Sequence, residues 1–536
     1  MMFRRVLVAN RGEIAVRVIR AIHELGAEAV AVYSDADRGA RHVRMADHAV
    51  RIGPAPASES YLDGSAILAA ARATGAEAIH PGYGFLSERG DFARACARDG
   101  ITFVGPSPAT LDVTGDKVSA RALALQAGAR LVPGTPGPIG PDADASGEAS
   151  RIGYPLLIKA AAGGGGKGMQ VVREAAELAP ALESARRIAV AAFGDDGVYL
   201  ERLVVHARHV EVQVFGDGHG DVVAIGDRDC SIQRRYQKVI EEAPAPGLPP
   251  ATRARLHADA IAIARAARYG GAGTVEFLYD PEAGDAYFME VNARLQVEHP
   301  VTEAVSGVDL VHAQLHLAAG ASMYEALALA GWRDAIDGTV PPVVAIEARI
   351  CAEDPGSGWT PSTGRLGIVR EPGGPGVRVD SACEPGLEVG IDYDSLLAKV
   401  IAWGPTRTVA LARLRRALDE HVVTGVATTL PVLRWIARHP AFSVGGVPTS
   451  FLADHWRPSG ETSGGVGRAG ADGAGSNGMT DRSPDPSTLD AATAVACAAR
   501  AGTLADRHPA PQGGYPQGGG PTAWHLAARR DAIRGR

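Results

Sequence analysis

Residues 274–303 read TVEFLYDPEAGDAYFMEVNARLQVEHPVTE, and this stretch predicts a β-hairpin that presents two carboxylates. Both arms are rich in β-branched and aromatic residues, and Pro281 and Gly284 between them are typical of a turn. Glu276 and Glu290 are equally far from this turn, so we expect them to be close neighbours on the paired strands. Like charges in such positions destabilise a strand pair. Because paired carboxylates and substrate phosphates commonly hold Mg²⁺, the hairpin predicts a metal site.

The residues after Glu290 alternate between polar and apolar side chains. Asn292, Arg294, Gln296 and Glu298 fall on every second position, which places them on one face of an extended segment. A solvated outer face is the alternative, but an amide, a guanidinium, a second amide and an acid beside a metal pair favour a binding site. On a straight strand, Glu290 and Glu298 would lie roughly 26 Å apart. We therefore expect the strand to end near Asn292 and a loop to fold the rest of the segment back.

Composition narrows the class of protein. The 536 residues are enough for two to four domains, and the net charge of −7 argues against nucleic-acid binding. No apolar run reaches membrane-spanning length, and the N-terminal apolar stretch is too short for a signal peptide. The five cysteines are scattered without a CxxC pair. We expect a reduced cytoplasmic protein with no disulfide framework, no zinc site, no membrane and no nucleic-acid partner.

Lysine is rare in this chain. Of the 54 basic residues only five are lysines, namely Lys117, Lys159, Lys167, Lys238 and Lys399. A lysine retained in an arginine-rich chain indicates a position that needs a compact point charge instead of a planar fork. The first four lie in segments typical of phosphate binding. For Lys399 an ordinary surface position is an equally good interpretation.

The chain divides by pattern into successive regions. Residues 1–115 alternate strands and helices, which predicts a parallel sheet. Residues 116–335 hold the motifs, and within them 131–204 form a small α/β module that we expect to act as a mobile lid. Residues 336–457 form a third unit. Residues 458–536 are low in apolar side chains and are expected to be a flexible linker and a poorly ordered tail.

A glycine-rich run follows an apolar strand inside the small module. Residues 159–169 read KAAAGGGGKGM, and such glycines let backbone N–H groups approach a phosphate closely. Lys159 and Lys167 add positive charge. The run is not a Walker loop, because its last glycine is not followed by Lys-Ser or Lys-Thr. A flexible linker is the alternative, but the position between two strands favours a flap.

A second basic stretch, GDRDCSIQRRYQKVI, precedes the hairpin. Arg234, Tyr236 and Lys238 alternate and are expected to share a face, with a basic surface strand as the alternative. Cys230 is interpreted as a small buried residue, because no base that would activate it is evident. His209 opens an alternating strand, and both a structural role and a ligand contact remain open for it.

In order along the chain, these motifs resemble one known family. ANRGEIA, HPGYGFLSE, GDK, KAAAGGGGKGM, RHVEVQV, DRDCSIQRRYQK, EVNARLQVEHPVTE, EARICAEDP and DYDSLLAK are together similar to biotin carboxylase, the ATP-grasp component of biotin-dependent carboxylases. The resemblance runs from Ala9 to Trp456. It implies an α/β fold, α+β in part, in which an ATP-grasp domain follows a doubly wound parallel-sheet N-terminal domain and precedes a biotin carboxylase C-terminal domain.

The resemblance also implies a role for individual residues. The residues that would hold ATP are Lys117, Lys159, Gly165, Gly166, Glu201, Leu203, His209 and Gln233. The metal ligands would be Glu276, Glu290 and Asn292. The bicarbonate pocket would consist of Lys238, Arg294, Gln296 and the backbone of Val297. Glu298 would be the general base, and Arg349 would stabilise the biotin enolate. Tyr236 stands where some members have histidine, so no nucleotide contact is assigned to it.

The implied activity is the carboxylation of biotin through carboxyphosphate, as the first half-reaction of an acyl-CoA carboxylase. It would use ATP, Mg²⁺ or Mn²⁺, and bicarbonate. Biotin is carried on a lysine, and no lysine follows Lys399, so we expect a biotin carboxyl carrier protein acting in trans. A carboxyltransferase subunit and a homodimer are the other expected partners.

Two other functions are compatible with parts of the sequence. One is a different ATP-grasp ligase that acts on an amine or ammonia, as in carbamoyl phosphate formation; the run EVNARLQVEHP and Arg349 argue against it. The other is a catalytically silent scaffold that docks a carrier or a carboxyltransferase. A scaffold predicts the loss of metal or base residues, and these are present.

Overall fold

The computed structural model describes residues 2–140, 144–160, 169–193, 196–332 and 343–457. These residues belong to one unit, Met1–Thr462. The second unit, Ser463–Arg536, lies outside the described residues, and so does the linker and tail predicted for 458–536.

The N-terminal region contains the predicted parallel sheet. Its strand order is β3-β2-β1-β4-β5, with β1 at Arg5–Val8, β2 at Glu28–Ser34, β3 at His48–Gly53, β4 at Ala78–His80 and β5 at Thr102–Phe103. Val6 and Val8 pack on one face with α1 (Gly12–Glu24), whereas Leu7 packs on the other with α3 (Gly64–Thr74) and α4 (Gly90–Arg98). Alternate side chains of β1 thus enter two cores, as a doubly wound sheet requires.

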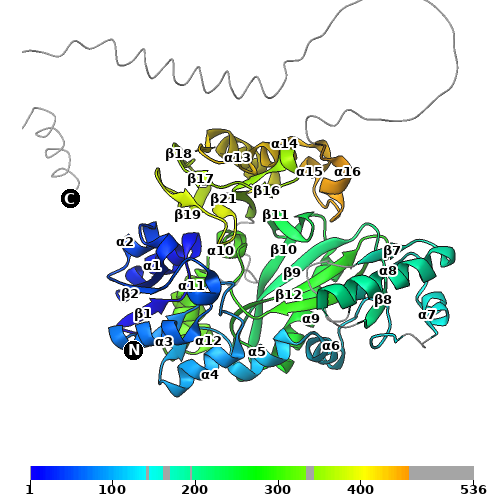
Figure 1. Cartoon of the computed structure of the whole chain (residues 1–536), viewed down its shortest axis with the longest axis horizontal. Helices are drawn as coiled ribbons and strands as arrows, with labels where there is room; N and C mark the ends of the chain where they lie inside the picture. The colour runs from blue at the N-terminus through cyan, green and yellow to red at the C-terminus, as the bar shows by residue number, and fades with distance from the viewer. Residues whose placement is uncertain (1, 141–143, 161–168, 194–195, 333–342, 458–536) are drawn as a thin grey trace, which may run out of the picture. The chain divides into compact units, whose positions relative to one another are not determined.

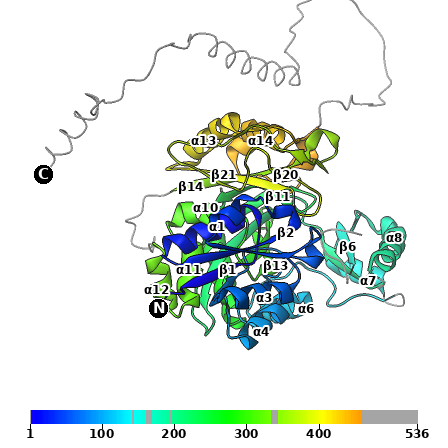
Figure 2. The same ribbon diagram turned by 60° about the vertical axis from the view of Figure 1, so that its left-hand side comes forward.

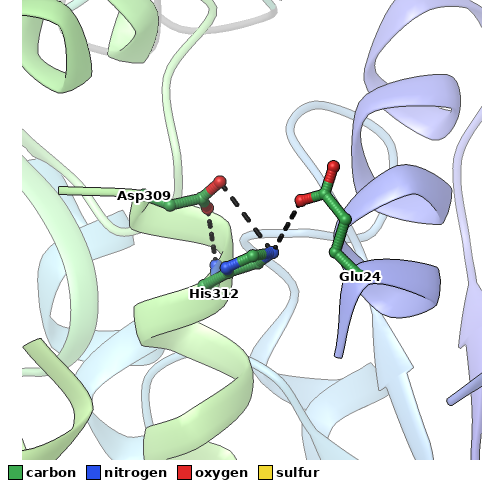
Figure 3. Close-up of side chains that lie close together, drawn as sticks. All are labelled: Glu24, Asp309 and His312. Atoms are coloured by element: carbon green, nitrogen blue, oxygen red, sulfur yellow. Dashed lines mark hydrogen bonds and ion pairs between the residues drawn. The ribbon is translucent and has the colours of Figure 1, made fainter. Parts of the chain in front are cut away.

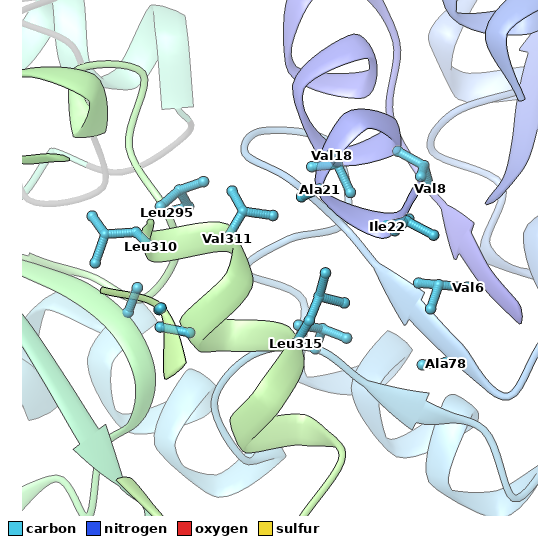
Figure 4. Close-up of a cluster of buried hydrophobic side chains, with 14 of the residues drawn as sticks. Val6, Val8, Val18, Ala21, Ile22, Ala78, Leu295, Leu310, Val311 and Leu315 are labelled. Carbon is cyan, nitrogen blue, oxygen red and sulfur yellow. The ribbon is translucent and has the colours of Figure 1, made fainter. Parts of the chain in front are cut away.

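Helix α11 (Leu310–Ala318) follows the hairpin in the chain and packs against the N-terminal region. Its Leu310, Val311 and Leu315 share one buried cluster with residues of α1, and Figure 4 shows Val311 pointing toward that helix. Leu295 lies in the segment between the hairpin and helix α10 (His299–Ser306) and belongs to the same cluster. The loop predicted to carry the site residues is therefore anchored in the core of the N-terminal sheet.

Polar contacts join the same two helices. His312 Nε2 on α11 lies 3.1 Å from Glu24 Oε2 on α1, and Asp309 caps α11 by accepting a hydrogen bond from the His312 backbone N–H (Figure 3). Asp309 also pairs with Arg17 of α1 at 2.7 Å. Ion pairs thus supplement the apolar contact between α1 and α11.

The second sheet has eight antiparallel strands in the order β13-β12-β9-β10-β11-β14-β21-β19. Their bounds are β9 Arg208–Asp217, β10 Val222–Arg234, β11 Gln237–Ala243, β12 Gly270–Asp280, β13 Asp285–Asn292, β14 Val344–Cys351, β19 Val377–Ser381 and β21 Leu396–Gly404. Because β14 pairs with β11, this sheet continues across the division expected at residues 335 and 336.

Helices cover both parts of this sheet. Helix α9 (Pro250–Ala266) packs on β9 and β12 through a core of aliphatic side chains. Helices α13 (Arg407–Glu420) and α14 (Leu430–Arg438) pack on β14 and β21, and Figure 2 shows them above these strands. Helix α10 (His299–Ser306) contacts β10, β11, β14 and β21 directly after the hairpin and its loop.

The predicted hairpin is confirmed in detail. Strands β12 and β13 are paired so that Glu276 is the direct partner of Glu290. Strand β13 ends at Asn292, and α10 begins at His299, which leaves the six residues between them as a loop. The chain thus bends where the length of a straight strand required it to bend.

The small module has a sheet of its own. Its order is β7-β6-β8, with β6 at Leu156–Ala160, β7 at Gln170–Val172 and β8 at Val198–Arg202. Helices α7 (Ala145–Ile152) and α8 (Ala175–Phe193) lie against it, at the right in Figures 1 and 2, around a separate apolar core. Gly165, Gly166 and Lys167 of the glycine run lie outside the described residues.

Shorter elements complete the described chain. The helices are α2 Arg41–Met45, α5 Pro108–Gly115, α6 Lys117–Gln126, α12 Met323–Leu329, α15 Pro440–Val444 and α16 Phe451–His455. The strands are β15 Glu353–Asp354, β16 Thr360–Pro361, β17 Gly364–Arg365, β18 Val369–Arg370, β20 Glu388–Val389 and β22 Val422–Val423.

One local prediction is wrong. Arg234, Tyr236 and Lys238 do not share a face, because Arg235 and Tyr236 form the turn between β10 and β11 with φ angles of 49° and 69°. Lys238 is instead the cross-strand partner of Gln233, and Tyr236 is exposed. The period-two pattern was interrupted by a tight turn that contains no glycine or proline.

Other compositional expectations can be compared with the described residues. Within them, Cys96, Cys230, Cys351 and Cys383 are free and buried. No helix in the described ranges is long and apolar enough to cross a membrane. Cys230 is fully buried, and burial together with Glu211 raises the pKa of its thiol, which fits the structural interpretation of this residue.

Candidate active site

Lys238 lies at the centre of the site, surrounded by three carboxylates. Its Nζ donates to Glu211 Oε2 at 2.6 Å, Glu276 Oε1 at 2.9 Å and Glu298 Oε1 at 2.6 Å. The four side chains come from β11, β9, β12 and the loop before α10. Burial favours the neutral amine, but the three carboxylates outweigh it and raise the pKa of Lys238 well above its ordinary value. The ammonium therefore stays charged and draws these acids together.

Arg228 is a buried hydrogen-bond donor that orients neighbouring residues of the site. It is fully buried on β10, and all five of its N–H groups are engaged. Its acceptors are Glu211 Oε1 at 2.5 Å, Gln213 Oε1 at 2.8 Å, Thr302 Oγ1 at 2.8 Å, Thr274 Oγ1 at 2.9 Å and Gln296 Oε1 at 2.6 Å. A guanidinium that uses its whole donor set fixes the orientation of Glu211 and Gln296.

Glu298 lies between two cations. Besides the bond from Lys238, its Oε2 accepts a bond from Arg349 Nη2 at 2.8 Å, and Arg349 Nε donates to Glu241 at 2.5 Å. Burial opposes ionisation, but Lys238 and Arg349 outweigh it and lower the pKa of Glu298 to about 2. Glu298 is therefore a carboxylate at neutral pH, in the form that a general base requires.

The two hairpin carboxylates differ in their surroundings. Glu276 Oε1 also accepts from Asn292 Nδ2 at 2.8 Å and from Gln296 Nε2 at 3.0 Å. Glu290 is open to solvent on one side, and burial of the rest of the carboxyl, together with the charge of Glu276, raises its pKa. The structure thus brings Glu276, Glu290 and Asn292 together as predicted and leaves a repulsive carboxylate pair that a divalent cation would relieve.

His209 is a counter-ion for this pair. Its Nε2 lies 3.1 Å from Glu276 Oε2, and its Nδ1 lies 2.9 Å from Gln233 Nε2. Burial lowers the pKa of His209, but the charge of Glu276 outweighs burial and raises it to about 9. Nε2 of His209 therefore faces the Glu276 carboxylate, while Nδ1 is held by the Gln233 amide.

Arg294 and Val297 complete the loop side of the site. Arg294 Nη2 donates to Asn292 Oδ1 at 2.8 Å, and its Nε donates to Glu88 at 3.1 Å. The carbonyl oxygen of Val297 accepts a bond from Lys399 Nζ at 2.8 Å. The four residues expected to form a bicarbonate pocket are therefore close together. Lys238 and Gln296 both bond Glu276, Arg294 bonds Asn292, and the Val297 peptide leads into Glu298.

The predicted ATP residues fall in two groups. In the small module, the Glu201 carboxylate accepts a bond from Lys159 of β6, and it also accepts one at 3.1 Å from Arg121 of α6, which precedes the module. The backbone N–H of Leu203 is bonded to Pro155. His209 and Gln233 belong to the large sheet instead, beside Glu276. Lys117 begins α6. Its charge partly offsets the rise in the pKa of Glu290, so Lys117 lies near the metal pair.

Sequence reasoning missed several residues that position the others. They are Glu88, Arg121, Glu211, Arg228 and Glu241. A signal existed for Glu211, because the strand VEVQV alternates polar and apolar side chains and is buried along its whole length. In a strand buried on both faces, alternating polar residues line a site and not a solvated surface. No comparable pattern marks Glu88 or Arg121.

Comparisons with known proteins agree along the chain. The family model described as "Biotin carboxylase, N-terminal domain" matches residues 2–111, "Carbamoyl-phosphate synthase L chain, ATP binding domain" matches 116–326, and "Biotin carboxylase C-terminal domain" matches 347–454. The sequence is 50% identical over 452 residues to the biotin carboxylase of Pseudomonas aeruginosa, covering 84% of this chain and 98% of the relative. It is 44% identical over 478 residues to the propionyl-CoA carboxylase alpha chain of Ruegeria pomeroyi, covering 85% of this chain and 68% of the relative.

A solved structure is similar over the same region. It is the biotin carboxylase domain dimer of Hydrogenobacter thermophilus 2-oxoglutarate carboxylase, in complex with MgADP, ADP and bicarbonate. The TM-score is 0.77 at 44% sequence identity, and the match covers 85% of this chain and 98% of that one.

Proposed function

The chain belongs to the biotin carboxylase family, and we propose how its residues carry out the ATP- and bicarbonate-dependent carboxylation of biotin that this membership assigns to it. The comparisons thus confirm the resemblance to biotin carboxylase and the fold class that the sequence predicts. The observation that supports the proposed roles best is Glu298 held between Lys238 and Arg349, one cation on each carboxylate oxygen.

In the first step, bicarbonate attacks the γ-phosphorus of ATP and ADP leaves. We assign the ATP phosphates to Lys117, Lys159 and the glycine run, and the adenine end to Glu201 and Leu203. Glu276, Glu290 and Asn292 would hold Mg²⁺ or Mn²⁺, which supplies charge neutralisation at the phosphates. Asn292 directs its amide N–H at Glu276 and accepts a bond from Arg294 at its oxygen, and the second lone pair of that oxygen would be available to a metal.

The bicarbonate anion would bind beside Lys238, Arg294, Gln296 and the backbone of Val297. A guanidinium and an ammonium suit a small planar anion. Lys238 and Arg349 suppress the basicity of Glu298 in the resting site. An anion that draws either cation toward itself raises the pKa of Glu298, which then accepts the hydroxyl proton of bicarbonate. The base thus becomes effective when its substrate is bound.

The second step transfers the carboxyl group. Carboxyphosphate breaks into CO₂ and phosphate, phosphate takes the ureido N–H proton of biotin, and the resulting enolate attacks CO₂ through nitrogen. Arg349 supplies a fixed cation for the developing negative charge. Its second bond, to Glu241, keeps the guanidinium in place if Glu298 or the phosphate moves.

Partners and location extend the proposal. Relatives form biotin carboxylase domain dimers, and we propose a homodimer for this chain too. We also propose that the biotin is carried on a separate carrier protein, which acts in trans. We further propose that a carboxyltransferase passes the carboxyl group to an acyl-CoA, as in the propionyl-CoA carboxylase relative, in the cytoplasm.

Carbamoyl phosphate formation is a second candidate, since the model that matches residues 116–326 is named after a carbamoyl-phosphate synthase. That model covers the ATP-binding part, whereas the flanking models and Arg349 belong to the biotin reaction. The difference is testable, because ammonia would replace biotin as the acceptor.

The test measures ADP release with Mg-ATP and bicarbonate, with and without free biotin, for the wild type and Glu298→Gln. We expect biotin to stimulate turnover and the variant to lose at least about 100-fold in kcat while it still binds Mg-ATP. Glu282→Gln, an exposed glutamate in the hairpin turn, is the matched control and should match the wild type. Stimulation by ammonia but not by biotin would contradict the proposal.

A further inference from the structure

Lys399 is the one lysine to which the sequence assigned no site, and the structure places it in the interior. It lies on β21 and is fully buried. An ammonium withdrawn from water is costly unless acceptors and opposite charges surround it. Its Nζ donates to the carbonyl oxygen of Val297 at 2.8 Å and lies 3.1 Å from Glu13 Oε1 and 3.8 Å from Asp380 Oδ2.

These three contacts come from three separate stretches of chain. Glu13 lies on α1 of the N-terminal region, Asp380 on β19, and Val297 in the loop between β13 and α10. The Val297 carbonyl belongs to the peptide bond that leads directly into Glu298. One ammonium therefore holds the peptide plane from which the general base projects.

The loop has no strand ladder to hold that peptide plane. The preceding carbonyl, that of Gln296, is within 2.7 Å of His299 Nδ1, and Leu295 is anchored in the buried cluster of α1 and α11. The Val297 carbonyl depends on a side chain from β21. Without that donor a buried carbonyl loses its partner, and the peptide is free to rotate toward another one.

The charges around Lys399 are arranged so that it stays protonated. Asp380 is also held by Arg378 at 2.7 and 2.8 Å, and Glu13 accepts a bond from Tyr83. Burial lowers the pKa of Lys399, but Glu13, Glu347 and Asp380 outweigh it and raise the pKa. The ammonium is thus a permanent donor to the loop.

Lys399 is also the direct cross-strand partner of Arg349 and of Asp380. Arg349 and Lys399 therefore lie side by side on one face of the sheet, where Arg349 binds the side chain of Glu298 and Lys399 binds the carbonyl of the preceding residue, Val297. An arginine would present a larger planar group to acceptors that surround a single point. This explains why a chain so rich in arginine keeps a lysine here.

We propose that Lys399 is a positioning residue of the carboxylation reaction, which holds the Val297–Glu298 peptide and so fixes the base and the backbone edge of the bicarbonate pocket. The inference rests on the proposed roles of Glu298 and Val297. It predicts an effect on bicarbonate and on the chemical step, and none on ATP, because the described bonds of Lys159, Glu201, His209 and Gln233 go to residues other than Lys399.

The test compares Lys399→Met with the wild type, with active sites counted by Mg-ATP binding. We expect kcat for biotin-dependent ADP release to fall about 100-fold and the bicarbonate KM to rise, with the ATP KM within about 2-fold. Lys399→Arg, which keeps the charge and donors, should recover part of kcat. Asp37→Asn removes a buried carboxylate that Arg11 and Tyr61 hold and that is not a contact of Lys399, so it should lower the melting temperature but leave kcat per site unchanged.

Wild-type kcat and bicarbonate KM in folded Lys399→Met would overturn the inference, as would an equal rise in the KM of ATP and bicarbonate. Failure of both Lys399 variants to fold would also overturn it, because the residue would then be structural only. A wild type that shows no bicarbonate- and biotin-dependent turnover would instead refute the proposed function on which the inference rests. The two failures are thus distinguishable.

Discussion

At the scale of single residues, the site is a balance of buried charges. Lys238 and Arg349 share Glu298, and each is also bound to a further carboxylate, Glu211 or Glu241. Pairing of this kind seldom adds net stability, because desolvation offsets most of the attraction. Its effect is instead to fix the protonation state and position of each group, so removing one charge should change both pH dependence and rate.

Glu298→Gln should change how stability depends on pH. The pKa of Glu298 is lowered from 4.5 to about 2, so its contribution to stability is present above pH 4.5 and is lost as the pH falls toward 2. We expect the wild type to exceed the variant most in free energy of unfolding near neutral pH and the gap to narrow below pH 4.5. Urea unfolding across a pH series measures this, with Glu282→Gln as the control for the substitution itself. A gap that widens on acidification would contradict the sign.

Arg349→Lys should impair the biotin-dependent reaction but leave nucleotide binding intact. The guanidinium bonds Glu241 and Glu298 through different nitrogens, at 2.5 and 2.8 Å, which an ammonium on a shorter, unbranched stem cannot reproduce. We expect biotin-dependent turnover to fall about 100-fold, while Mg-ATP binding is retained. ADP release and nucleotide binding, measured side by side, test this. Retention of biotin stimulation in the variant would show that a cation of any shape suffices.

At the scale of elements, the hairpin of β12 and β13 sets the distance between the metal carboxylates. Gly284 in its turn has φ of +67°, and a Cβ there would meet no atom within 4 Å. The glycine is therefore needed for backbone conformation and not for space. Four residue pairs of the two strands lie between this turn and the Glu276–Glu290 pair, so strain introduced in the turn should remain local.

Gly284→Ala should destabilise the protein by about 1 kcal/mol, because an L-residue is strained in the left-handed region. Gly284→Asn should cost less, since asparagine tolerates this conformation, which makes it the matched control. The measurement is the free energy of unfolding of the three proteins. The kcat of each should remain that of the wild type, because the turn contacts no site residue, and equal stability of the alanine variant and the wild type would refute the argument.

The same elements show what the sequence could predict. Equal spacing from the turn identified Glu276 and Glu290 as partners, and strand length required the bend after Asn292. Periodicity failed at Arg235 and Tyr236, because their left-handed turn carries none of the usual turn residues. The contacts of Arg228 and Lys399 were beyond prediction, since they depend on which strands become neighbours, and no local pattern encodes that register.

At the scale of the whole described unit, one sheet unites two of the regions that the sequence separates. Strand β14 lies beside β11, so Arg349 comes next to Glu241 and within reach of Glu298. Helix α11 and Lys399 tie the N-terminal region to the same loop. The small module has its own sheet and core and carries several of the proposed ATP residues, which makes it the part expected to respond to nucleotide.

We therefore predict that Mg-ATP slows proteolysis of the small module. Lys159 and Glu201 now satisfy each other, and ATP phosphates would compete for Lys159 and draw β6 and β8 toward the large sheet. Because cleavage requires local opening, trypsin should cut more slowly after Arg151 on α7 and Arg187 on α8, both exposed, when Mg-ATP is bound. Arg438 on α14, outside the module, is the internal control and should be cut at an unchanged rate. Mass spectrometry of timed digests measures all three sites, and equal rates at the module sites with and without nucleotide would argue against a module that closes on ATP.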